Sequence, residues 1–184
     1  MNKSPPHSTW TIKELSTCIL CNRANRYPIS SQLFASASYL GNGLLWYLLM
    51  LGLLITQGMQ AVPAVLSMII TGVAATVIYR FLKQSTMRPR PCAISDELIR
   101  TVEPLDRFSF PSGHTLHAVA FTLIACSWYP SLSWFLMPFT MIVAISRLVL
   151  GLHYPSDVLA GAALGAIGAS FTLLICHPLQ MGTY

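Results

Sequence analysis

Long apolar stretches alternate with short polar segments along most of the chain. Five stretches, each close to the roughly 20 residues that a membrane-spanning helix needs, cover residues 35–55, 61–82, 112–129, 132–152 and 158–176. Within the last, Gly161, Gly165 and Gly168 have the spacing that lets helices approach closely in lipid. The pattern predicts an all-α, polytopic membrane bundle of about five transmembrane helices.

The N-terminal segment has a different pattern. Residues 10–26 mix apolar side chains such as Trp10 and Leu15 with Lys13, Glu14 and Arg23. This stretch is too short and too charged to span a membrane, so we expect an interfacial helix with Trp10 and the arginines at headgroup level. The chain is therefore divided into residues 1–34, an N-terminal tail and interfacial helix, and residues 35–184, a membrane domain.

The composition supports a membrane protein. Of the 184 residues, 54% are hydrophobic and only 9% are charged, and the mean hydropathy is +0.59, whereas soluble domains are about 25% charged. The net charge of +5 comes mostly from isolated lysines and arginines, which indicates anionic lipid and gives no indication of nucleic acid binding. Five scattered cysteines suggest no disulfide framework.

Charge is concentrated at one end of the predicted bundle. If all five stretches span, the end of the second, the start of the third, the end of the fourth and the start of the fifth share one face, and every charged residue lies on that face. Charge at membrane depth is costly and usually functional. One polar site at this end is therefore expected.

Three segments at this end carry groups that can bind phosphate. They are residues 83–91 (KQSTMRPRP), 111–114 (PSGH) and 146–157 (SRLVLGLHYPSD). Lys83, Arg90 and Arg147 supply positive charge, and Ser112 and Gly113 at a helix start supply backbone N–H groups. Together these groups predict an oxyanion site.

The same segments carry groups for phosphoryl transfer. His114 and His153 can act as nucleophile and acid near neutral pH. Asp157, four residues after His153, can hold its imidazole in one tautomer with the attacking nitrogen bare. A zinc site drawn through His114, His117, His153 and Asp157 is disfavoured, because the neighbouring lysine and arginines would repel a cation.

The three segments resemble the signature of the type 2 phosphatidic acid phosphatase superfamily of membrane lipid phosphatases. That signature reads K-x6-RP, PSGH and SR-x5-H-x3-D. The chain matches every fixed position, namely Lys83, Arg90 and Pro91, then Pro111 to His114, then Ser146, Arg147, His153 and Asp157. The match covers residues 83–157 with three spaced motifs in the family order.

The resemblance implies a role for each residue. His153 would take the phosphoryl group as phosphohistidine, oriented by Asp157, and His114 would protonate the leaving oxygen. The phosphate would be bound by Lys83, Arg90, Ser112, Gly113 and Arg147. No metal or other cofactor is implied, and residues 35–184 would form the phosphatase domain.

The implied substrate is a lipid phosphate monoester or diphosphate in the membrane. We rank undecaprenyl diphosphate first, then phosphatidylglycerophosphate or phosphatidate, then lipid A phosphate. Two alternatives stay open: an anionic-lipid transporter or binding protein without turnover, and a phosphotransferase that passes phosphate from one lipid to another. No obligate protein partner is indicated.

Some charged residues outside the motifs are interpreted more simply. Arg23, Arg26, Arg80 and Arg88 are interpreted as membrane-surface anchors, and His117 as a packing residue behind His114. By analogy with the family the chain belongs in a bacterial inner membrane. The leaflet of the site is open, because the positive-inside rule places the charged end in the cytoplasm and the habit of the family places it outside.

Overall fold

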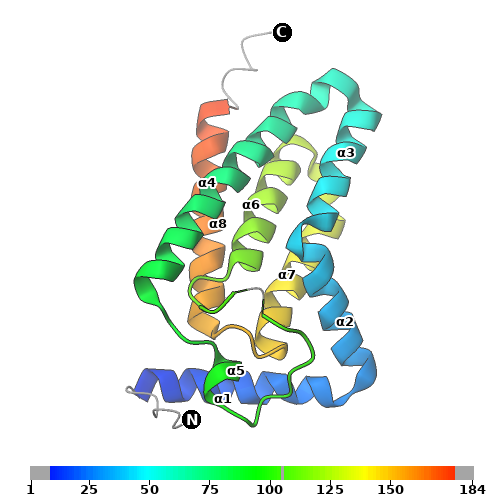
Figure 1. Cartoon of the computed structure of the whole chain (residues 1–184). Coiled ribbons are helices and arrows are strands. Elements are labelled where there is room, and N and C mark those ends of the chain that lie inside the picture. The colour runs from blue at the N-terminus through cyan, green and yellow to red at the C-terminus, as the bar shows by residue number, and fades with distance from the viewer. Residues whose placement is uncertain (1–8, 105, 177–184) are drawn as a thin grey trace.

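The N-terminal helix lies across one end of a helical bundle (Figure 1). The structure, a computed structural model, describes residues 9–104 and 106–176. Helix α1 spans Thr9–Asn22 and continues into a 3-10 turn, η1, at Arg23–Arg26. The helix predicted over residues 10–26 is confirmed, and residues 1–8 of the predicted tail lie outside the described residues.

The first long apolar stretch forms a kinked helix and the second runs back beside it. Helices α2 (Pro28–Tyr39) and α3 (Leu45–Gln57) are joined by a π-helical turn, η2 (Leu40–Leu44). At Gly43, φ is 135°, a conformation that glycine adopts at least cost. A short turn, η3 (Gly58–Ala61), leads into α4 (Val62–Thr86). The α2 segment begins at Pro28, ahead of the predicted start at residue 35. Its first turns contain Ser30, Ser31 and Gln32, so the apolar pattern did not include them.

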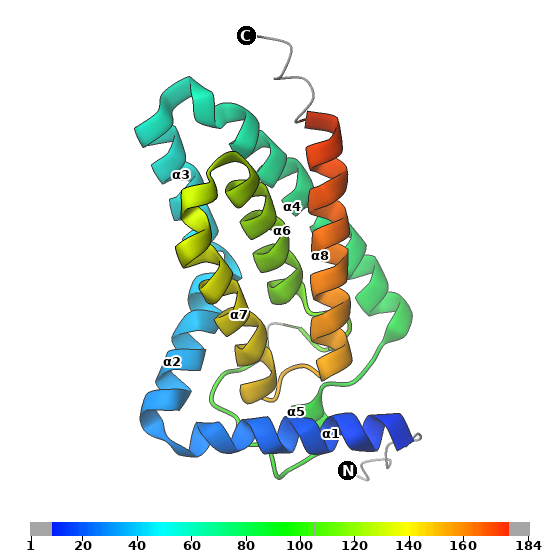
Figure 2. The same cartoon turned by 180° about the vertical axis from the view of Figure 1, so that it is seen from behind.

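Helix α6 occupies the centre of the bundle. The remaining elements are α5 (Pro91–Ile94), α6 (Gly113–Trp128), η4 (Pro130–Leu132), α7 (Ser133–Val149) and α8 (Pro155–Cys176). Helices α4, α7 and α8 pack around α6 (Figures 1 and 2). Ile124 of α6 is fully buried together with Trp46, Met68 and Leu136 from its neighbours. This core fixes the start of α6 relative to the charged end.

Small residues bring α8 close to α6. A Cβ atom added at Gly161 would lie 2.5 Å from the backbone oxygen of Ser112, and one at Gly165 would collide with that of Leu116. The predicted close approach is confirmed at these two glycines, whereas Gly168 makes an ordinary contact with Thr71 of α4. The first turns of α6 and α8 are therefore held side by side.

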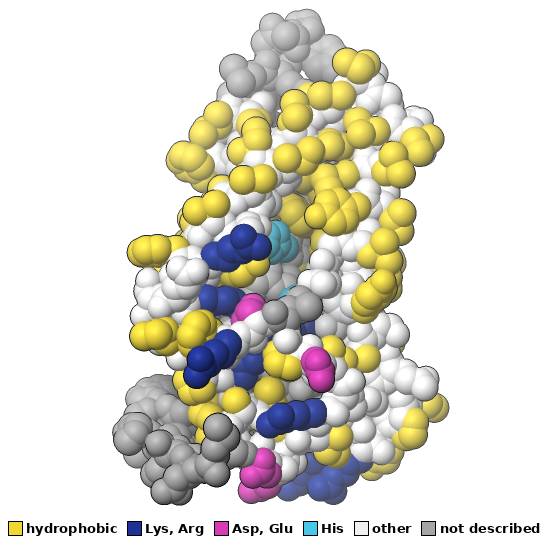
Figure 3. Space-filling model, in the orientation of Figure 1, with side chains coloured by type: hydrophobic (Ala, Val, Ile, Leu, Met, Phe, Trp, Pro, Cys, Tyr) yellow, Lys and Arg dark blue, Asp and Glu magenta, His cyan; other side chains and the backbone are white. Residues whose placement is uncertain are grey.

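The bundle has an apolar outer surface and one charged end. Among the residues that the structure describes, three segments are long and apolar enough to cross a membrane, Pro28–Thr86, Pro130–Val149 and Pro155–Cys176. The first contains the antiparallel pair α3 and α4. On the face in Figure 3, hydrophobic side chains cover the upper part and charged ones gather below. The all-α membrane bundle is confirmed, and the number of five crossings stays a prediction, as does the division at residue 35.

Candidate functional site

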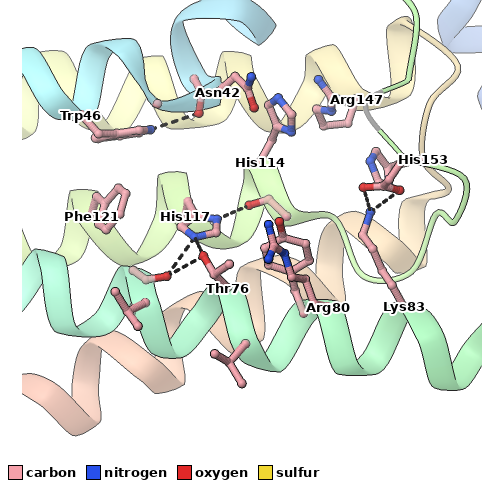
Figure 4. A pocket seen from close by; sticks show the side chains of 18 of the residues that line it. Asn42, Trp46, Thr76, Arg80, Lys83, His114, His117, Phe121, Arg147 and His153 are labelled. Carbon is pink, nitrogen blue, oxygen red and sulfur yellow. Dashed lines mark hydrogen bonds and ion pairs between the residues drawn. The ribbon is translucent and has the colours of Figure 1, made fainter.

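A cavity of about 1030 Å³ opens at the charged end of the bundle. Six of the eight predicted site residues line it: Lys83, Arg90, Gly113, His114, Arg147 and His153. Figure 4 shows Lys83, His114, Arg147 and His153 converging on this space from α4, α6, α7 and the turn between α7 and α8. The other two predicted residues, Ser112 and Asp157, are fully buried behind the wall.

The geometry of His153 defines which nitrogen is bare. Its Nε2 lies 3.1 Å from Nη1 of Arg90, and because a guanidinium can only donate, Nε2 accepts and the ring hydrogen is on Nδ1. Nδ1 lies 3.7 Å from Oδ2 of Asp157, longer than a hydrogen bond. Burial and the nearby charges of Arg147 and Arg90 hold the pKa of His153 well below its ordinary value. The imidazole is therefore neutral, with Nε2 facing the cavity.

Asp157 is held by groups on the side away from the cavity. Its Oδ2 accepts the backbone N–H of Tyr154 at 2.8 Å, and its Oδ1 accepts Nη1 of Arg88 at 2.7 Å. The interpretation of Arg88 as a membrane-surface anchor is therefore wrong. Arg88 lies two residues before Arg90 of the motif, and nothing in the sequence indicates that it contacts Asp157.

Two of the predicted phosphate-binding cations already share an acidic partner. Lys83 Nζ donates to both carboxylate oxygens of Asp106, at 2.7 and 2.9 Å, and Arg90 Nη2 donates to Oδ1 at 2.8 Å. Burial alone would raise the pKa of Asp106, but the hydrogen bonds and charges of Lys83 and Arg90 hold it below its ordinary value. The Asp106 side chain is 41% exposed and lines the cavity.

Arg147 at the end of α7 lines the cavity and has a hydrogen-bond donor that is unused within the described part of the chain. The residue is buried, and its Nη1 donates to Oγ of Ser38 on α2. Its Nε has no hydrogen-bond partner among the described residues. A buried guanidinium that is only partly satisfied suits a polyatomic anion with several acceptor oxygens.

The start of α6 differs in one detail from the expectation. The backbone N–H of Ser112 donates to the backbone oxygen of Asp157 at 3.0 Å, and its Oγ shares a hydrogen bond with Thr115 at 2.9 Å. The close packing of α6 on α8 takes up this N–H group, so Ser112 does not offer it to the cavity. Gly113 and His114, the next two residues, line the cavity wall.

His117 lies one turn beyond His114 in α6. Its Nδ1 donates to the backbone oxygen of Gly113 at 2.8 Å, and its Nε2 is 3.1 Å from Oγ1 of Thr76 on α4. These contacts agree with a packing residue that also borders the cavity. Within the described ranges, no group of three His, Cys, Asp or Glu side chains is arranged to hold a metal ion.

Sequence reasoning missed several residues of this region. Asp106 and Glu14 are single acids outside any spaced motif, and only the fold brings them to Lys83 and Arg88. Arg80, interpreted as an anchor, is exposed and also borders the cavity.

The fold and the site define a polytopic helical membrane protein with a polybasic cavity at one end, which His114, His117 and His153 line. Residues 60–180 match the PAP2 superfamily. The chain belongs to this superfamily, and the family resemblance of the three motifs is confirmed.

Three curated relatives are similar to this chain. The bacitracin transport permease protein BcrC of Bacillus licheniformis is 29% identical over 68% of this chain and 63% of its own length. Undecaprenyl-diphosphatase BcrC of Bacillus subtilis is 32% identical over 53% and 50%, and a lipid A 1-phosphatase of Rhizobium johnstonii is 29% identical over 57% and 45%. The chain thus spans about half to three fifths of the length of these relatives.

A solved structure has the same fold. The PAP2 type phosphatidylglycerolphosphate phosphatase of Bacillus subtilis aligns with a TM-score of 0.75 over 95% of this chain and 90% of its own, at 21% sequence identity. This likeness supports the membrane bundle described above.

Proposed function

We propose that the protein is an integral membrane phosphatase that hydrolyses lipid phosphate monoesters or diphosphates through a phosphohistidine. The observation that carries the proposal is the neutral His153, whose Nε2 carries no hydrogen and accepts from Arg90 in a cavity that Lys83 and Arg147 also line. An anion-binding protein needs the cations, but it has no need of an oriented imidazole.

The proposed reaction has two steps. Nε2 of His153 attacks the terminal phosphorus atom, and the bond from phosphorus to the leaving oxygen breaks. The leaving oxygen belongs to the lipid alcohol in a monoester and to the lipid monophosphate in a diphosphate. In a monoester that oxygen takes a proton from His114, and in a diphosphate it departs with less need of one. Water then gives a proton to His114 and attacks the phosphohistidine, and the phosphorus–nitrogen bond breaks to release inorganic phosphate. The phosphate is bound by Lys83, Arg90, Arg147 and the start of α6 at Gly113, with Ser112 acting through its position behind this turn.

The cavity also suits a lipid tail. Beyond the charged groups its lining becomes apolar, with Tyr47 on α3, Ile69, Val73 and Val77 on α4, and Phe121 on α6. Leu48 and Ile70 on the neighbouring turns are exposed on the outer surface. The headgroup would enter the charged end while the tail stays between α3 and α4.

Undecaprenyl diphosphate is the first-ranked substrate. A relative named as an undecaprenyl-diphosphatase supports this ranking, while a lipid A 1-phosphatase of similar identity supports a competing one. A panel of purified lipid phosphates assayed for phosphate release in EDTA tests both the substrate and the independence from metal. Loss of release in His153→Ala is expected, whereas release by that variant would refute the proposed mechanism.

Two alternatives have their own tests. The first alternative is an anionic-lipid transporter, and one relative is named as a transport permease. Binding of lipid phosphates without any phosphate release would favour this alternative. A labelled lipid diphosphate donor distinguishes hydrolysis from transfer to a second lipid. The proposed location is a bacterial inner membrane, and a reporter fused after Tyr184 would assign the leaflet, since an exported C-terminus puts the charged end in the cytoplasm.

A further inference from the structure

Helix α1 faces the turn that carries His153 with one continuous row of side chains. Glu14, Cys18 and Asn22 are four residues apart and so lie on one face of the helix. Asn25 extends the row into η1. Cys18, Asn22 and Asn25 are buried, whereas Ile12 and Leu20 elsewhere on α1 are exposed. Leu15 and Ile19 beside this row pack against an apolar cluster, so the inner face of α1 combines apolar packing with a row of polar contacts.

Each side chain of this row contacts the backbone around His153. Cys18 Sγ donates to the backbone oxygen of His153 at 3.4 Å, and burial raises the pKa of Cys18 to about 12, so the thiol keeps its hydrogen. Nδ2 of Asn22 and Nδ2 of Asn25 donate to the backbone oxygen of Val149, at 2.8 and 2.9 Å. The end of α7 and the backbone of His153 are both tied to α1.

Glu14 connects this row to Asp157 through Arg88. Glu14 Oε2 accepts Nη2 of Arg88 at 2.5 Å, and Nη1 of the same guanidinium donates to Asp157 Oδ1 at 2.7 Å. Glu14 Oε1 accepts the backbone N–H of Ser156 at 2.9 Å. The guanidinium also lies 4.0 Å from the centre of the Tyr154 ring, so its plane is fixed from several sides.

The side chains of Glu14, Arg88 and Asp157 are largely buried, so losing one of these contacts would leave a charge without a partner away from water. The side chain of Asp157 is 0% exposed, and those of Glu14 and Arg88 are 17% and 23% exposed. A buried carboxylate that loses its cation is strongly disfavoured, so the contact with Arg88 offsets the cost of burying Asp157 and holds its side chain in place. Glu14 in turn contacts the other end of the Arg88 guanidinium through Nη2.

Resting on the phosphatase chemistry proposed above, we propose that Glu14 and Arg88 are positioning residues, which hold the Asp157 carboxylate beside His153 and so control the rate of phosphoryl transfer without touching the substrate. The α1 helix would then form the rear wall of the active site. Neither residue lines the cavity, and their variants should therefore leave phosphate binding intact.

The test compares Glu14→Gln and Arg88→Lys with matched controls. Glu103→Gln and Arg23→Lys make the same chemical changes at exposed positions. For each full-length variant in detergent we would measure kcat/KM on the lipid phosphate that the wild type hydrolyses fastest, the inhibition constant of inorganic phosphate, and the thermal unfolding midpoint. The inhibition constant reports binding by the cavity cations, and kcat/KM reports transfer to His153.

Arg88→Lys is expected to lose about 10- to 100-fold in kcat/KM, because a single ammonium nitrogen cannot occupy both the Nη1 position beside Asp157 and the Nη2 position beside Glu14, and a small misplacement has an effect of this size. Glu14→Gln should lose less, about 3- to 10-fold, because the amide oxygen can still accept the N–H of Ser156. The inhibition constant should stay within about twofold of the wild type in both variants, and both controls should behave as the wild type.

Three outcomes would overturn the proposal. If both variants had the kcat/KM of the wild type, the network would only attach α1 to the bundle. The same conclusion would follow if kcat/KM, phosphate inhibition and the unfolding midpoint all decreased together. If Arg88→Lys does not fold, Glu14→Gln decides by the same constants. If the wild type released phosphate from none of the lipid phosphates, the proposed function would be refuted, and this inference would fall with it. That outcome is recognised from the wild type alone, before any variant is measured.

Discussion

Arg88 and Arg90 stand two residues apart but serve opposite sides of the turn that carries His153. Arg90 faces the cavity, where it contacts Nε2 of His153 and shares Asp106 with Lys83. Arg88 faces α1 and contacts Glu14 and Asp157. Asp106 on the cavity side has a side chain that is 41% exposed, whereas the side chains of Glu14 and Asp157 on the rear side are 17% and 0% exposed. The cavity side is thus suited to exchanging partners with a substrate, and the rear side to a permanent contact.

The largest expected effect lies at the point where the two sides meet. His153→Ala should abolish turnover on every substrate, together with any acid-labile, base-stable phosphoenzyme, because the nucleophile is needed whatever leaves. Trapping with a labelled phosphate donor measures the phosphoenzyme. A phosphoenzyme in the variant would show that His153 is not the nucleophile. The comparison of a cavity side and a rear side around His153 would then have no catalytic meaning.

His114 on the cavity side should matter according to the leaving group. His114→Ala is expected to lose about 10² to 10⁴ in kcat/KM on a lipid phosphate monoester, whose alkoxide needs a proton. The loss should be smaller on a diphosphate or nitrophenyl phosphate, which depart with little help. Equal losses on good and poor leaving groups would recast His114 as a phosphate ligand.

Arg147 tests whether the cavity cations act through shape or through charge. Arg147→Lys should be nearly as damaging as Arg147→Ala, with about 10² to 10³ lost in kcat, because an ammonium cannot reproduce a planar fork on two phosphate oxygens while also reaching Ser38. If the lysine variant kept most of its activity, Arg147 would act only through its positive charge and not through two directed hydrogen bonds to phosphate.

Spaced motifs and apolar length were enough to predict much of the molecule. Five apolar stretches gave the helices, and the three motifs located six residues of one cavity, because these features depend on residues near one another in sequence. Glu14 and Asp106 could not be predicted from the sequence, since each reaches its partner through the fold and has no motif around it. The engaged N–H of Ser112 depends on the packing of Gly161, a tertiary contact that spacing alone does not specify.

Asp106 should compete with phosphate for the cavity cations. Asp106→Asn removes the charge between Lys83 and Arg90 and keeps the shape of the side chain. Because the side chain is partly exposed, each ion pair contributes at most about 1 kcal/mol, so the inhibition constant of inorganic phosphate should fall by about two- to fivefold. Glu103→Gln, a similar change in the same loop, should leave it unaltered. Weaker inhibition in Asp106→Asn would show that Asp106 holds the cations in place for substrate.

The smallest expected effect is a pH dependence of stability on the rear side. Burial alone would raise the pKa of Glu14, but hydrogen bonds from Ser156 and Arg88 hold it below its ordinary value of 4.5. A carboxylate with a lowered pKa in the folded state adds stability above its ordinary pKa, and this stability is lost as pH falls through the lower, folded value.

Thermal unfolding in detergent should show this contribution directly. Glu14→Gln should unfold at a lower temperature than the wild type at pH 6, by an amount that corresponds to less than about 1 kcal/mol, and the gap between the two proteins should narrow as the pH falls below the ordinary pKa of 4.5. Asp106 also has a lowered pKa, so the stability of both proteins depends on pH through Asp106. Only the difference between the two proteins therefore reports on Glu14. A constant gap between the two proteins from pH 6 to 3.5 would mean that Glu14 contributes to stability through its shape and contacts, and that its charge adds nothing to the rear side.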